Sequence, residues 1–142
     1  MIRNIARVLG LRKESTGERG ECLAGRFLSW KKRYAIVARN WRNPKDRREE
    51  LDLVCKDGEI LVFVEVKTRD SLSAVRGYDA VNARKRKVMR RAALAYLFAL
   101  APSRRPKAVR FDVVEVSQPA GGGEPQILHF ENISVLGRHF LP

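Results

Sequence analysis

The stretch from residue 50 to residue 69 constrains the fold of this chain more than any other. Two apolar runs, 51–55 and 60–66, flank the sequence Lys-Asp-Gly-Glu at 56–59. Asp-Gly between two such runs is the strongest short-range signal for a β-hairpin. The second run has no polar alternation at 60–64, which is typical of a strand covered on both faces. We therefore predict an antiparallel hairpin in the middle of an α/β sheet.

The register of this hairpin groups three charged side chains. If the loop holds two or four residues, Asp52 faces Phe63 across the hairpin. Because side chains alternate between the faces of a strand, Asp52, Glu65 and Lys67 then share one face, with the two carboxylates roughly 7–8 Å apart at the backbone. A three-residue loop would shift the register and separate them. Buried carboxylates are costly unless a cation or hydrogen bonds compensate them, so two on one face can share a divalent cation.

The order of these residues resembles a known signature. Asp52, followed thirteen positions later by Glu65-Val66-Lys67, resembles the catalytic pattern of the PD-(D/E)xK restriction-endonuclease-like superfamily. Sequence blocks over residues 17–116 are similar, in order, to the YraN-like family of proposed endonucleases, with a weaker echo at 129–132. At Glu49 this chain departs from that pattern, which has a glycine there. The blocks are Gly20-Glu21-x-x-Ala24, Arg39-Asn40, 50–54, 62–69, Ala80-Val81-x-x-x-Lys85 and 111–114.

The resemblance implies a metal-dependent endonuclease that hydrolyses phosphodiester bonds of DNA. Asp52 and Glu65 would bind Mg²⁺ or Mn²⁺, with the carbonyl of Val66 as a third ligand. Lys67 would orient the nucleophilic water or stabilise charge at phosphorus, and Glu21 matches a helical glutamate that assists metal binding. Archaeal Holliday-junction resolvases belong to a similar branch of the superfamily, which implies branched or damaged DNA as substrate. Symmetric cleavage of a duplex or junction would require a homodimer.

The remaining segments place this hairpin within one domain. The order of elements predicts a mixed β-sheet flanked by helices on both faces, which agrees with the restriction-endonuclease-like core that the resemblance implies. We expect a nuclease-like domain over 15–142. Its expected parts, after a basic leader at 1–14, are a helix over 15–32, a strand over 34–38, a charged loop over 43–48, a polar loop over 69–79, a long helix over 79–100, a strand over 109–116 and a last strand over 126–130.

The charge of the chain favours a polyanionic partner. With 29 Lys and Arg against 16 Asp and Glu, the formal net charge is +13. Nucleic acid is the first candidate and an anionic membrane the second. A charge run is usually a solvated helix face, but six cations in eight residues without a balancing acid repel one another unless a polyanion binds. The predicted nucleic-acid-binding residues are Arg69, Arg84, Lys85, Arg86, Lys87, Arg90 and Arg91.

Other features of the sequence argue for a cytoplasmic protein. The longest apolar stretch, 92–101, is about half of the roughly 20 residues that cross a bilayer. The first nine residues interleave arginines with apolar residues and lack the continuous apolar segment of a signal peptide. Cys22 and Cys55 have no metal-ligand spacing and are expected to be reduced thiols, and His129 and His139 receive no chemical role.

Two alternatives to an endonuclease stay open. The first is a catalytically silent nucleic-acid-binding protein that retains a metal site, which metal binding without cleavage would favour. For the site itself, Asp52, Glu65 and Lys67 can also be a buried salt-bridge cluster without chemistry. The other alternative, a basic protein that docks on membranes or an acidic partner, predicts no metal dependence. Glu50 can either join the acidic site or face solvent.

Overall fold

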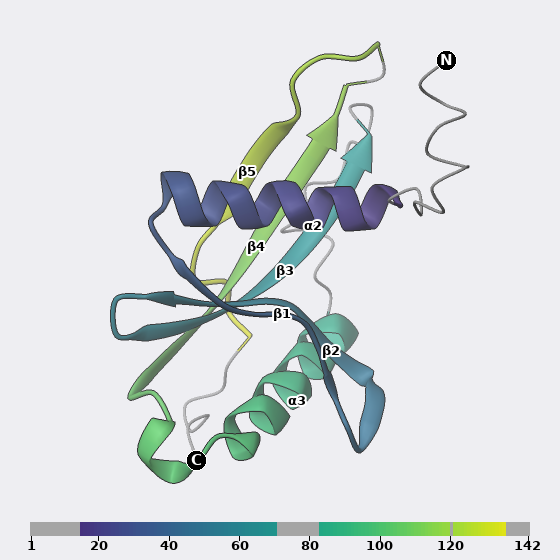
Figure 1. Cartoon of the computed structure of the whole chain (residues 1–142). Helices are drawn as coiled ribbons and strands as arrows, with labels where there is room; N and C mark the ends of the chain where they lie inside the picture. The colour runs from purple at the N-terminus through teal and green to yellow at the C-terminus, as the bar shows by residue number, and fades with distance from the viewer. Residues whose placement is uncertain (1–14, 71–82, 120, 136–142) are drawn as a thin grey trace, which may run out of the picture.

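Within the part of the chain that the structure describes, five strands form one mixed sheet in the order β1-β2-β3-β4-β5 (Figure 1). The computed structural model describes residues 15–70, 83–119 and 121–135. Only β3 and β4 pair in parallel, and the other neighbours are antiparallel. This arrangement confirms the expected α/β fold with a mixed sheet. The strands are β1 (Ala35–Asn43), β2 (Asp46–Asp57), β3 (Ile60–Asp70), β4 (Ala108–Gln118) and β5 (Gln126–Phe130).

Among the described residues, two α-helices cover the sheet. Helix α2 (Thr16–Arg26) starts at a capping box, in which Ser15 and Glu18 each accept a hydrogen bond from the other's backbone N–H, and it continues into a π-helical turn, η1 (Phe27–Lys31). This confirms the helix predicted over 15–32. Helix α3 (Ala83–Ala99) ends before a short 3₁₀ turn, η2 (Pro102–Arg104), as the proline predicts. The expected start of this helix at 79, residues 71–79 of the predicted polar loop and the basic leader lie outside the described residues. The predicted start of that loop at 69 is wrong, because β3 continues to Asp70.

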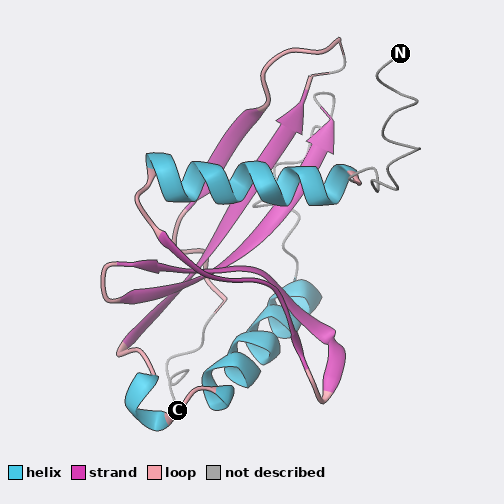
Figure 2. Ribbon diagram, viewed as in Figure 1, coloured by secondary structure: helices cyan, strands magenta, loops and turns pink. Residues whose placement is uncertain are grey.

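Each helix buries a different face of the sheet. Ala24 of α2 and Leu28 of η1 pack with Val62, Val64 and neighbouring side chains in one apolar cluster. Figure 2, in the same view as Figure 1, shows α2 crossing the strands of the sheet. On the other face, Met89, Ala93 and Leu97 of α3 pack with Phe63 and Phe111. Strand β3 is therefore covered on both sides, as its lack of polar alternation predicts. No helix among the described residues is long and apolar enough to cross a membrane.

The β2–β3 hairpin forms, but its predicted register is wrong by two residues. Val54, not Asp52, faces Phe63. The loop consists of Gly58 and Glu59, and Gly58 has φ of 59°, the left-handed conformation that favours glycine at the first position of such a loop. A shift of two residues preserves the alternation of side chains, so Asp52 keeps its predicted face.

The charged loop predicted over 43–48 is also wrong. Strand β1 continues to Asn43, strand β2 starts at Asp46, and these two residues pair, so only residues 44–45 form the turn. Asn43 accepts a hydrogen bond from the N–H of Lys45 at 3.0 Å, and Asp46 accepts one from the N–H of Arg48 at 3.1 Å. Side chains that bond nearby backbone in this way favour tight turns. The polar side chains of Asn43 and Asp46 thus stabilise the hairpin tip, and this segment belongs to the sheet.

Strands β2 and β3 pair over only part of their lengths. The ladder between them runs from Asp57 and Ile60 to Leu53 and Val64. Beyond it, β2 pairs with β1, and β3 pairs with β4 (Figure 1). The sheet therefore forks, and the next residue on each arm of the fork is acidic.

Candidate active site

Asp52 and Glu65 meet at this fork. The Oδ2 of Asp52 accepts a hydrogen bond from the backbone N–H of Val66 at 2.8 Å. Where β2 and β3 separate, the side chain of Asp52 thus accepts a backbone hydrogen bond in place of a carbonyl of the neighbouring strand. Burial, and next the charge of Glu65, raise the pKa of Asp52 to about 7. The fork therefore brings together two carboxylates, of which Asp52 is poorly compensated.

Two lysines bind the same oxygen of Glu65. The Nζ of Lys67 lies 3.1 Å from Oε1 of Glu65, and the Nζ of Lys85 lies 3.0 Å from it. Lys67 is two residues along β3 and so shares the face of Glu65, whereas Lys85 reaches across from α3. Lys85 is therefore part of this site, where the sequence predicted a surface contact with nucleic acid. We call Glu21, Asp52, Glu65, Lys67 and Lys85 the fork site.

Glu21 reaches this cluster because α2 lies very close to β3. Gly20 is buried, and a Cβ atom at this position would collide with the hydroxyl of Thr68. Burial raises the pKa of Glu21; a hydrogen bond from Asn40 opposes this, and the charges of Glu50, Glu18 and Glu65 raise it further. The predicted helical glutamate thus lies within electrostatic reach of the strand carboxylates.

Asn40 is a contributor that sequence reasoning missed. It has φ of 48°, a left-handed conformation that asparagine tolerates better than most residues, and its side chain bonds Glu21. Its neighbour Arg39 lies against α2 at Gly25, where a Cβ atom would come within 2.5 Å of the guanidinium. The Arg39-Asn40 block was the available signal, although no role was predicted for it.

Glu50, whose role was open, forms an exposed ion pair. Its Oε2 lies 3.1 Å from the guanidinium of Arg42 on the neighbouring strand, and both side chains are about half exposed. Its charge still contributes to the raised pKa of Glu21. Glu50 therefore lies beside the fork site rather than within it.

The donor set of the fork site fits a hard divalent cation. Mg²⁺ prefers oxygen ligands and is commonly held by one or two carboxylates, with water completing its shell. Asp52 and Glu65 supply that pair, and a cation would relieve the repulsion that raises the pKa of Asp52. Within the described ranges, no three His, Cys, Asp or Glu side chains are arranged to hold a metal ion on their own. The ligand role of the Val66 carbonyl remains a prediction.

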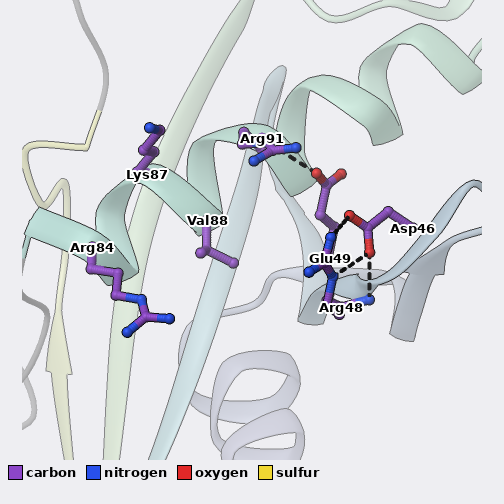
Figure 3. A pocket seen from close by; sticks show the side chains of 7 residues that line it. All are labelled: Asp46, Arg48, Glu49, Arg84, Lys87, Val88 and Arg91. Carbon is purple, nitrogen blue, oxygen red and sulfur yellow. Dashed lines mark hydrogen bonds and ion pairs between the residues drawn. The ribbon is translucent and has the colours of Figure 1, made fainter.

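The predicted basic surface divides into several environments. Arg69 is only 17% exposed, and its Nε lies 3.9 Å from Glu115, so it is less accessible than predicted. Arg84, Lys87 and Arg91 are exposed on α3, whereas Arg86 and Arg90 are half-buried. The exposed three border a pocket of about 360 Å³ between α3 and the tip of the β1–β2 hairpin, which we call the hairpin pocket (Figure 3). Its lining is Asp46, Arg48, Glu49, Arg84, Lys87, Val88 and Arg91.

A second polar cluster centres on Asp112 in the middle of β4. This carboxylate is completely buried, and it accepts hydrogen bonds from the guanidinium of Arg110 at 2.8 and 3.0 Å and from the N–H of Asn132 at 3.0 Å. Nε2 of His129 lies 2.8 Å from it. Burial would raise the pKa of Asp112, but the bonds from His129, Arg110 and Asn132 outweigh it and hold the pKa below its usual value.

We call Arg110, Asp112, His129 and Asn132 the Asp112 network. Arg110 extends it to Asp57 and to the hydroxyl of Tyr34, at 3.0 and 2.6 Å. Sequence reasoning gave His129 no role, and the weak family echo at 129–132 was the available signal. Because these partners satisfy the carboxylate within the protein, the network is structural.

Comparison with known proteins places the chain among relatives of similar length. A family model described as "Uncharacterised protein family UPF0102" matches residues 20–116. A UPF0102 protein of Anaeromyxobacter dehalogenans is 41% identical over 118 residues, which cover 83% of this chain and 82% of that protein. One from Geobacter metallireducens is 39% identical, covering 87% and 95%. UPF0102 protein FRAAL5785 of Frankia alni is 46% identical, covering 78% and 87%.

Proposed function

The chain belongs to the uncharacterised protein family UPF0102, and from the chemistry of its fork site we propose that it is a metal-dependent endonuclease acting on DNA. The matched span, 20–116, contains all five fork-site residues. The observation that carries the proposal is the meeting of Asp52 and Glu65 at the fork, with an Asp52 pKa of about 7. Such a perturbed carboxyl beside a like charge is typical of functional sites.

Asp52 and Glu65 would hold the divalent cation, with Glu21 assisting. When bound, the cation would neutralise charge on the phosphate oxygens and lower the pKa of the attacking water. Asp52 is held toward the site by the N–H of Val66, and Glu65 is held by Lys67 and Lys85. Lysines from two elements, β3 and α3, thus hold the carboxylate of Glu65 in place, which favours a preorganised site.

Lys67 is the candidate for the group that acts on the reacting atoms. Its side chain is about one-third exposed and its ammonium contacts Glu65, so it can donate a hydrogen bond toward an incoming phosphate or water. In this position it would orient the water for in-line attack, or stabilise the negative charge that develops around phosphorus. Lys85 is equally exposed and is the positioning residue for Glu65.

The proposal includes the PD-(D/E)xK assignment. The mixed sheet with helices on both faces, the Asp52 and Glu65-Val66-Lys67 pattern, and the adjacent helical Glu21 all support it. The resemblance to archaeal Holliday-junction resolvases favours branched or damaged DNA as substrate. The net charge of +13 also favours a nucleic-acid partner.

A cleavage assay tests this function. Single-stranded, duplex, flapped and four-way DNA would be incubated with the protein in Mg²⁺ or Mn²⁺. We expect cutting by the parent, and a loss of about 10²-fold or more in Lys67→Ala, because a charge stabiliser in the transition state is removed. Glu124→Gln, an exposed acid in the β4–β5 connection, is the matched control that should cut like the parent. Equal cutting by Lys67→Ala would point to a contaminating nuclease.

Cation binding is measured separately. Calorimetric titration with Mn²⁺ should give a signal with the parent and with Lys67→Ala, and none with Glu65→Gln. DNA binding without cutting in either metal would instead favour the silent nucleic-acid-binding protein.

A further inference from the structure

The hairpin pocket pairs each of its acids with an arginine. Oε1 of Glu49, which is 8% exposed, lies 3.1 Å from Nε of Arg91, while its other oxygen accepts a hydrogen bond from Asn43 at 2.9 Å. Arg48 binds Asp46 with two donors, at 3.0 and 2.9 Å, and lowers the pKa of that carboxyl to about 2 (Figure 3). Both acids are thus compensated at neutral pH.

Two cations remain in the pocket once these pairs are formed. Within the described ranges, neither Arg84 nor Lys87 makes an ion pair, and both side chains are exposed on the α3 wall (Figure 3). The lining therefore has a net charge of +2, from four cations and two anions. A concave site of one sign attracts a counter-ion more strongly than a flat surface does.

Helix geometry places this pocket next to the fork site. Residues 84, 87, 88 and 91 recur at helical spacing and form one stripe of α3, which faces the hairpin. Lys85 follows Arg84 directly, and it points instead to Glu65. Because consecutive Cα atoms are only about 3.8 Å apart, one ligand that continues past the fork site can reach both.

We propose that the hairpin pocket binds a backbone phosphate of the nucleic-acid substrate that lies beside the phosphate undergoing attack, with Arg84 and Lys87 as its charged contacts. This inference rests on the proposed function for the identity of the ligand. The guanidinium of Arg84 matches phosphate in geometry, Lys87 supplies a point charge, and Val88 gives the pocket an apolar wall. The protein then holds a polymer at two points and positions the scissile bond between them.

The proposal assigns phosphate binding to fewer basic residues of α3 than the sequence predicted. Arg86 and Arg90 lie on the other flank of α3 and do not line the pocket. Arg91 is held by Glu49 and shapes the pocket wall. Of the charges on α3, the two that remain uncompensated in the pocket should dominate binding.

The test is equilibrium binding by the metal-free full-length protein. Fluorescence anisotropy of a labelled DNA duplex, in EDTA at a series of salt concentrations, would compare the parent with Arg84→Gln/Lys87→Gln. We expect about tenfold or more weaker binding at 0.1 M salt, and a salt slope reduced by about 1–2. Arg104→Gln/Lys107→Gln removes the same charge from exposed residues beyond the other end of α3, and it should change affinity by about twofold at most. Circular dichroism would confirm that both variants are folded.

The possible outcomes distinguish a failure of the pocket proposal from a failure of the proposed nuclease function. Equal affinities and slopes for the two double variants would overturn the pocket, whatever the parent cleaves in Mg²⁺. Selective loss of binding by the pocket variant would support it even if no DNA is cut, and only the proposed function would then fail. If inorganic phosphate or a mononucleotide displaced the duplex at micromolar concentration, the pocket would be a small-anion site and the proposal would be wrong. Absence of DNA binding by the parent would also overturn it.

Discussion

Asp52 and Asp112 are aspartates on strands of the same sheet, and burial raises the pKa of both, yet their net pKa shifts are opposite. Asp112 is fully buried and its pKa is lowered, because Arg110, Asn132 and His129 all bind it. Asp52 receives one backbone N–H, lies beside the negative charge of Glu65, and has its pKa raised to about 7. Burial alone therefore does not decide the pKa of a carboxyl; the number of donors that bind it does.

The Asp112 network should give the largest effect on stability. Asp112→Asn leaves the buried side of Arg110 without its counter-charge, so we expect a loss of about 3–5 kcal/mol in the free energy of unfolding. Urea denaturation at pH 7 measures it. Asp57→Asn is the matched control, because Asp57 binds the same arginine but is 41% exposed, and it should cost less than about 1 kcal/mol. Equal losses in the two variants would show that Asp112 is not the main buried counter-charge of Arg110.

Asp52→Asn should have the opposite effect and increase the free energy of unfolding. The pKa of Asp52 is about 7 in the folded state and near 3.8 in the unfolded state. Between pH 3.8 and pH 7 the folded protein therefore binds more protons than the unfolded chain, so its stability falls as the pH rises through this range. The substitution removes this penalty while leaving an acceptor for the Val66 N–H. We expect a gain of about 1–3 kcal/mol at pH 8 and little change below pH 4.

The measurement is urea denaturation of the parent and Asp52→Asn across pH 4–8 in EDTA. Glu124→Gln is the control for loss of an acid outside the fork. A destabilised Asp52→Asn at pH 8 would mean that the carboxylate is compensated by groups other than those described.

The close approach of α2 to the sheet predicts a smaller effect at Gly20. Gly20→Ala should cost about 1–2 kcal/mol, because the added methyl group collides with Thr68. Gly17→Ala on the same helix meets no such neighbour and should be neutral or stabilising by up to about 1 kcal/mol. Thermal denaturation would compare them, with Thr68→Ala added to Gly20→Ala. If Thr68→Ala restored none of the loss, the collision would not be its cause.

The exposed pair of Arg42 and Glu50 should matter least. Glu50→Gln is expected to change the free energy of unfolding by about 0.5 kcal/mol or less, because both partners are about half exposed and water screens them. Denaturation at low salt and at 0.5 M NaCl measures this contribution. A loss above about 1 kcal/mol would place Glu50 within the fork site.

Features set by local sequence could be predicted. The capping box at Ser15, the hairpin around Gly58 and the strand at 126–130 depend on residues close together in the chain, and the structure contains all three. The exact register did not follow, because glycine fits either position of a two-residue loop when only the sequence is known. Asp52 kept its face because the error was an even number of residues.

Features that depend on distant partners could not be predicted. Glu49 lies in a strand because Arg91 and Asn43 compensate its charge. In the sequence, Lys85 is one of six similar cations, and only the packing of α3 in the structure shows that it contacts Glu65. His129 gained its role from Asp112, seventeen residues earlier on the neighbouring strand. Pattern alone separates none of these residues from ordinary surface charges.

The connection between β3 and β4 has a consequence for the order of assembly. Asp52, Glu65 and Lys67 all come from one hairpin, whose contacts are local and form early in a folding chain. The parallel pairing of β3 with β4 requires the crossover that contains α3, and Lys85 on this helix reaches Glu65 only when α3 has packed against the sheet. During synthesis, the acidic pair would therefore exist before its helix-borne counter-charge, and docking of α3 would be the step that completes the site.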